Sequence, residues 1–80
     1  MYINVTIKQQ QQRFDIRIDS EQNIIEGLKV LTDSGKLPAD NHTYDYFRSF
    51  VRNTLVSANK TFAQEFIYDG DILEAVTPND

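Results

Sequence analysis

The spacing of the hydrophobic residues changes near residue 23, and this change limits the possible folds more than any other feature. In residues 3–7 and 14–18, apolar and polar residues alternate, which is typical of strands with one buried face. In residues 23–34, apolar residues recur every three or four positions, which predicts a helix with one apolar stripe. The residues that carry the two patterns are Ile3, Val5, Ile7, Phe14, Ile16 and Ile18 for the strands and Ile24, Ile25, Leu28 and Leu31 for the helix.

Polar residues and glycines mark the ends of these elements. Residues 9–12 are glutamines, so we expect an antiparallel hairpin with a longer or bulged loop, because the Gly or Asn of a tight turn is absent. Asn23 and Glu26 have the spacing of a capping box, and Gly35 supplies a left-handed C-terminal cap. Gly27 costs the helix about 1 kcal/mol relative to Ala. It indicates either a close approach to the sheet or a tolerated defect.

A third strand is predicted at residues 44–52, after a polar connection at 39–43. An arginine in the core of a small domain would be badly desolvated, so the face with Arg48 and Arg52 should be exposed. The same alternation places Tyr46 and Phe50 on the exposed face and Phe47, Ser49 and Val51 on the buried one.

The remaining pattern completes a single domain. Phe62, Phe66 and Ile67 are expected to anchor an irregular stretch in the core. Residues 77–80 form a polar tail that should fray. The other expected elements are turns at 53–54 and 69–71, a short strand at 55–56 and a last strand at 72–76. This order predicts an α+β domain over residues 1–76, a β-grasp with a mixed sheet of about five strands packed on one helix.

Composition excludes several classes of partner. The formal net charge is -4 with a pI near 4.7, so no surplus of positive charge is available for nucleic acid or an anionic membrane surface. No segment is long and apolar enough for membrane insertion, and the N-terminus has no secretory signal pattern. The chain has no cysteine, which fits a reducing compartment. We expect a cytoplasmic protein whose partner is another protein.

Residues suited to catalysis or metal binding do not form a recognisable constellation. His42 is the single histidine and falls in the polar connection, where a solvated side chain is the expected state. Asp69 and Asp71 begin like a calcium loop, but the required later Gly and Glu positions do not match. With Glu65 and Glu74 they are interpreted as a solvated acidic rim, with attraction of a basic partner as the alternative. We therefore expect no enzymatic activity, no cofactor and no metal.

Three short motifs stand out in the order of these elements: the Met1-Tyr2-Ile3 start, the Phe47-Arg48 pair in the third strand and the run from Gly70 to Glu74. With the order of the elements, they resemble the ubiquitin superfamily over residues 1–76. More narrowly, the chain is similar to the YukD/EsaB family of small ubiquitin-like accessory proteins of type VII (WXG100) secretion systems in Gram-positive bacteria.

The resemblance implies a non-enzymatic cytoplasmic accessory or regulatory protein that binds another protein, such as a subunit of the secretion apparatus. The chain ends in Pro78-Asn79-Asp80, whereas conjugated ubiquitin-like proteins and sulfur carriers end in Gly-Gly, so a carrier function is disfavoured. The YukD/EsaB family likewise lacks that ending. A homo-oligomeric structural module is the other alternative.

A protein-binding face can be predicted from strand alternation. If Leu73 and Ala75 face the core, Ile72 and Val76 face outward beside Phe50. Several apolar side chains rimmed by arginine are typical of a protein-binding patch. Its expected members are Phe50, Val76, Ile72, Tyr46, Arg48 and Arg52. The position resembles the recognition face of ubiquitin. The alternatives are a homodimer contact, or a bulge that turns Phe50 into the core.

Overall fold

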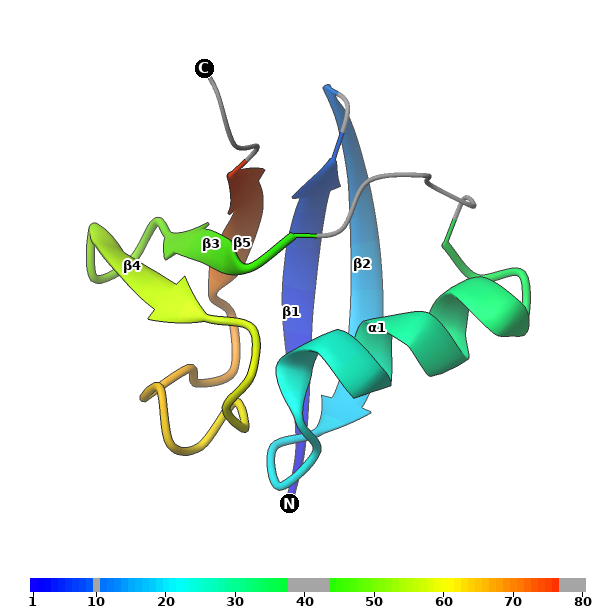
Figure 1. Cartoon of the computed structure of the whole chain (residues 1–80), viewed down its shortest axis with the longest axis horizontal. Coiled ribbons are helices and arrows are strands. Elements are labelled where there is room, and N and C mark those ends of the chain that lie inside the picture. The colour runs from blue at the N-terminus through cyan, green and yellow to red at the C-terminus, as the bar shows by residue number, and fades with distance from the viewer. Residues whose placement is uncertain (10, 38–43, 77–80) are drawn as a thin grey trace.

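One helix packs across one face of a mixed five-stranded sheet (Figure 1). The computed structural model describes residues 1–9, 11–37 and 44–76. The strand order is β2-β1-β5-β3-β4, in which β1 and β5 are parallel and the other neighbours are antiparallel. The elements are β1 Tyr2–Gln9, β2 Gln12–Asp19, α1 Ile24–Asp33, β3 Tyr46–Ser49, β4 Thr54–Ser57 and β5 Ile72–Val76. The predicted β-grasp with five strands and one helix is confirmed.

The N-terminal hairpin is longer and tighter than expected. β1 and β2 pair continuously from Tyr2 with Asp19 to Gln9 with Gln12. The expectation of a longer or bulged loop is therefore wrong, because Gln9 and Gln12 are themselves paired. Gln11 takes a positive φ of 65°, which a glycine or asparagine adopts more easily.

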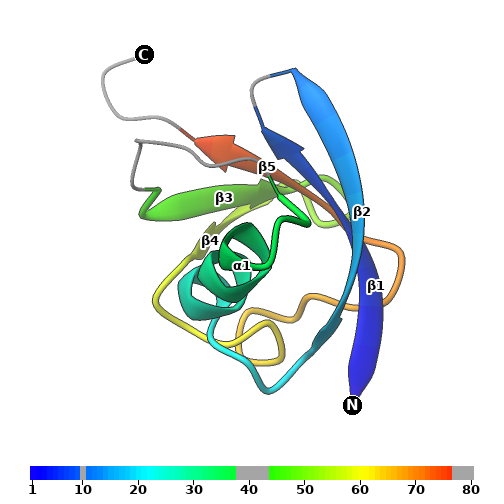
Figure 2. The same cartoon turned by 90° about the vertical axis from the view of Figure 1, so that its right-hand side faces the viewer.

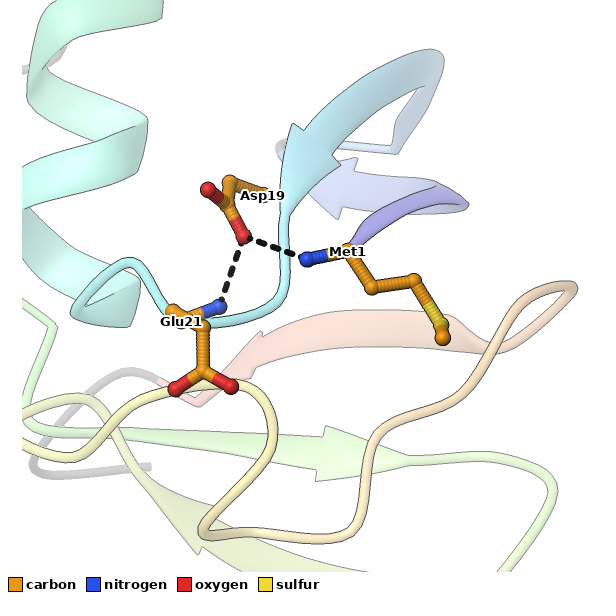
Figure 3. Close-up of polar contacts among 3 residues, drawn as sticks. All are labelled: Met1, Asp19 and Glu21. Carbon is orange, nitrogen blue, oxygen red and sulfur yellow. Dashed lines mark hydrogen bonds and ion pairs between the residues drawn. The ribbon is translucent and has the colours of Figure 1, made fainter.

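Asp19 holds together the open end of the hairpin, opposite the turn, by the contacts drawn in Figure 3. Its Oδ1 accepts hydrogen bonds from the Glu21 N–H at 3.0 Å and from the amino group of Met1 at 3.1 Å. The Glu21 N–H first, and then the charged amino group, hold the pKa of the Asp19 carboxyl below its usual 3.8. The stabilising contribution is present above that usual value and is lost as the pH falls through the lowered one.

The predicted residues Asn23 and Gly35 cap the two ends of α1, although among the described contacts only the Asn23 side-chain half of the capping box is formed. The Asn23 side chain accepts the Glu26 N–H at 3.2 Å, which satisfies one of the unpaired donors of the first turn. At the other end Gly35 has a φ of 84°, and the Lys36 N–H donates to the Leu31 carbonyl at 2.9 Å. The predicted helix limits are confirmed.

Gly27 marks a close approach between α1 and β2. A Cβ at this position would lie 2.6 Å from Cδ1 of Ile18 and 2.9 Å from Cγ of Gln22. Of the two interpretations left open by the sequence, the close approach is therefore the correct one.

The core fills the space between α1 and the face of the sheet turned toward it, here called the inner face; the opposite side is the outer face. Figure 2 shows α1 on one side of the sheet. The loop before β5 closes one end of the core with Phe62 and Ile67, which are fully buried as predicted. The core residues are Ile3, Val5, Ile7, Ile16, Ile18, Ile24, Leu28, Leu37, Tyr44, Phe47, Val56, Ala58, Phe62, Ile67 and Leu73.

Two sequence predictions of core residues are wrong. Phe66 is exposed, because it has a φ of 60° in a tight turn that turns Ile67 inward instead. The Ile67 N–H closes this turn by donating to the Phe62 carbonyl at 2.9 Å. Val51 is also exposed, because the pairing with β5 extends only to the Phe50 N–H, which donates to the Ile72 carbonyl, and the chain turns at this point.

Some predictions fall outside the described residues. They are the polar connection at 39–43 with His42 and the fraying of residues 77–80.

Truncation of the buried helix stripe should destabilise the whole domain. Leu28 is 7% exposed and belongs to the core, so Leu28→Ala should lower the free energy of unfolding by about 2–5 kcal/mol. Urea denaturation followed by circular dichroism measures the change. Lys29→Ala, on the exposed side of the same helix, is the control and should change it by less than ~0.5 kcal/mol. Equal midpoints for the two variants would contradict the packing.

Candidate protein-binding face

Antiparallel pairing between β3 and β5 brings the predicted site residues together. Tyr46 is paired with Val76, and the Phe50 N–H donates to the Ile72 carbonyl at 2.9 Å just beyond the end of β3. Opposite residues of an antiparallel pair project from the same face. Since Phe47 and Leu73, at neighbouring positions, are buried on the inner face, these four side chains belong to the outer face.

Exposure differs among the four apolar residues. Tyr46 is 52% exposed and Phe50 is 43% exposed, so Phe50 is not turned into the core by a bulge. Ile72 and Val76, on β5, are half-buried and are therefore less accessible parts of the same face. Leu55 on β4, opposite Arg48, is 55% exposed and extends the apolar surface. Leu55 was predicted only as part of a strand, because the sequence does not show which strand lies beside β3.

A row of charged residues crosses the same face. Arg48 is paired with Glu74, and Glu74 is paired with Lys8 of β1. The Lys8 ammonium lies 3.7 Å from the Glu74 carboxylate and 5.0 Å from the centre of the Phe50 ring. Lys8 thus contacts both an acid and an aromatic ring of the face. Its outward position follows from the alternation in β1, but its neighbours depend on the parallel pairing of β1 with β5.

Arg52 does not join this row. The guanidinium carbon of Arg52 lies 5.0 Å from the centre of the Phe66 ring. The backbone N–H of Arg52 donates to Ser49 Oγ at 3.3 Å. Arg52 and Phe66, together with Val51 and Tyr68, border a small hollow beyond the end of β3. Arg52 is exposed as predicted, but it is placed against the loop before β5.

Buried Asp71 holds the turn that positions Phe50. Ser49 Oγ donates to one carboxylate oxygen at 2.7 Å, and the N–H groups of Val51 and Ile72 donate to the other at 3.3 and 2.7 Å. Asp71 is only 3% exposed, so its assignment to a solvated acidic rim is wrong. A buried carboxylate needs such donors, and here they come from both sides of the exposed aromatic residue.

The other acidic residues of the expected rim also make local contacts. Glu65 accepts the Ser57 N–H at 2.7 Å, and Asp69 accepts the Asn4 N–H at 2.7 Å.

In the described residues, no group of three or more His, Cys, Asp and Glu side chains could hold a metal ion. The same part of the chain contains no helix with the length and hydropathy needed to cross a membrane.

Removal of the Asp71 carboxylate should loosen the turn. Asp71→Ala leaves buried Ser49 and two N–H groups without their acceptor, so the free energy of unfolding should fall by about 2–4 kcal/mol. Urea denaturation measures the change, with Asp45→Ala at an exposed position as the control. If both variants unfold at the wild-type urea concentration, Asp71 does not stabilise the turn.

Comparison with known proteins places the fold. No protein-family model matches the chain, and the search of curated proteins finds no significant match. Among solved structures, the chain is similar to the EccD5 ubiquitin-like domain from Mycobacterium xenopi, with a TM-score of 0.63 and 20% sequence identity. The match covers 100% of this chain and 98% of that domain. The chain therefore has a ubiquitin-like β-grasp fold.

Proposed function

We propose that this protein is a non-enzymatic cytoplasmic accessory or regulatory component of a type VII secretion system and acts by binding another protein. The sequence resemblance to the YukD/EsaB family supplies the secretion context. The likeness in fold to the EccD5 ubiquitin-like domain is compatible with it. The expected partner is a subunit of the secretion apparatus.

The observation that carries a binding role is the composition of the outer face. Exposed Tyr46, Phe50 and Leu55 lie with the basic groups of Lys8 and Arg48 on one surface of a chain whose net charge is -4. Aromatic and arginine side chains are enriched at protein interfaces and supply much of their binding energy. This face suits a partner with an apolar patch bordered by acidic side chains.

The contact between Lys8 and Phe50 favours binding because it orders both side chains in the unbound protein. The ammonium lies over the aromatic ring while also facing the Glu74 carboxylate, which restricts both side chains before a partner arrives. Less side-chain entropy is then lost on association. The ring nevertheless keeps 43% of its surface exposed, which leaves it available for contact.

The test compares two aspartate substitutions at exposed phenylalanines. Phe50→Asp alters the outer face, while Phe66→Asp alters a ring that is 54% exposed and also lies beside a cation, but outside that face. Wild-type protein and Phe66→Asp should capture the same secretion subunit from a lysate of the source organism. Phe50→Asp should lose it, and its Kd for the purified subunit should rise at least ~10-fold.

Folding must be checked in parallel. Both phenylalanines are exposed, so each variant should retain the wild-type circular dichroism spectrum and a free energy of unfolding within about 1 kcal/mol of it. Equal capture by all three proteins would refute binding through this face. Capture of further copies of this chain alone, lost in Phe50→Asp, would instead support the homo-oligomeric alternative.

A further inference from the structure

The strand β2 forms a free edge of the sheet. It stands at one end of the strand order, and within the described residues its ladder partner is β1 alone (Figure 2). The Ser20 N–H donates to the Met1 carbonyl at 2.7 Å, which fixes the phase of the ladder. Alternation in an antiparallel pair then directs the N–H and C=O groups of Arg13, Asp15 and Arg17 away from β1. These groups are arranged to bond to a further strand.

The charges along this edge are complementary to a second copy of the same edge. Arg13, Asp15, Arg17 and Asp19 alternate in sign, and the first three are exposed. When two copies of β2 run antiparallel about a two-fold axis at Ile16, Arg13 faces Asp19 and Asp15 faces Arg17 of the second copy. A slip of two residues in either direction sets like charges opposite each other, Asp15 on Asp15 or Arg17 on Arg17.

We propose that β2 is a homodimerisation edge, at which two copies of this chain pair antiparallel about Ile16 and join their sheets into one. In this register the residues that hydrogen-bond to the second copy are those whose N–H and C=O groups already point away from β1. The interface is isologous, as a two-fold axis requires. Alternating charge also deters unrelated strands from pairing with an edge, so the same pattern selects the second copy over other strands.

An apolar groove beside the edge fits the same arrangement. It has a volume of about 190 Å³, lies between β2 and α1, and includes Ile18, Gly27, Val30 and Leu31 in its lining. Pairing about Ile16 sets Phe14 of the second copy opposite Ile18, on the side of the sheet that faces α1. Val30 is 61% exposed in the single chain, so a covering side chain would remove apolar surface from water.

Charge reversal tests this register. Asp15→Arg gives an edge with arginine at both central positions, and Arg17→Asp gives one with aspartate at both. Each variant alone should dimerise at least ~10-fold more weakly than wild type in sedimentation equilibrium, because like charges then face each other. An equimolar mixture should regain the dimer, since each variant complements the other. Phe50→Asp should dimerise like wild type, which separates this edge from the outer face.

A readout on wild-type protein keeps the proposal testable if a variant folds poorly. The amide NMR signals of Asp15 and Arg17 should shift as the concentration rises from ~10 µM to ~1 mM, while that of buried Val56 stays constant. A wild-type monomer over this whole range would overturn the proposal. So would a folded mixture of the two variants that fails to regain the dimer, or a dimer that Phe50→Asp abolishes.

Discussion

The fold depends on the parallel pairing of the first and last strands at the centre of the sheet. Ile7 and Leu73 are paired there, and neither exposes any surface to solvent. The Gly70 N–H, which donates to the Asn4 carbonyl at 2.7 Å, extends this contact beyond the strands. Because side chains alternate along both strands, the pairing that builds the core also brings Lys8 beside Glu74 on the outer face. The same strand pairing therefore determines both the packing of the core and the arrangement of the candidate binding surface.

Asp71 links that surface to the interior. It lies immediately before β5 and accepts hydrogen bonds from Ser49 and Val51, the residues on either side of Phe50. A buried carboxylate that bonds to a short turn fixes where the turn leaves the sheet. The position of the exposed ring is therefore set by hydrogen bonds of the residues on either side of it. Binding at the face would act on a surface already ordered before contact, which suits recognition without a large rearrangement.

Local features were predictable because short-range physical rules decide them. The Asn23 cap, the left-handed Gly35 and the outward position of Phe50 follow from spacing and alternation over a few residues. Features set by distant segments were not predictable. Val51 is exposed because it lies in the turn after β3, where its N–H donates to the Asp71 carboxylate. Lys8 lies over the Phe50 ring because the first strand pairs with the last. Neither contact leaves a signal in the local pattern.

Contact between a partner and the outer face formed by β3 and β5 can be mapped by an NMR titration of 15N-labelled protein with a partner protein that has been captured from a lysate and purified. Shifted and broadened amide signals should cluster at Lys8, Arg48, Phe50 and Glu74, with small changes along α1. A perturbation confined to α1 or to the β2 edge, with the β3 and β5 signals unchanged, would contradict binding at the outer face.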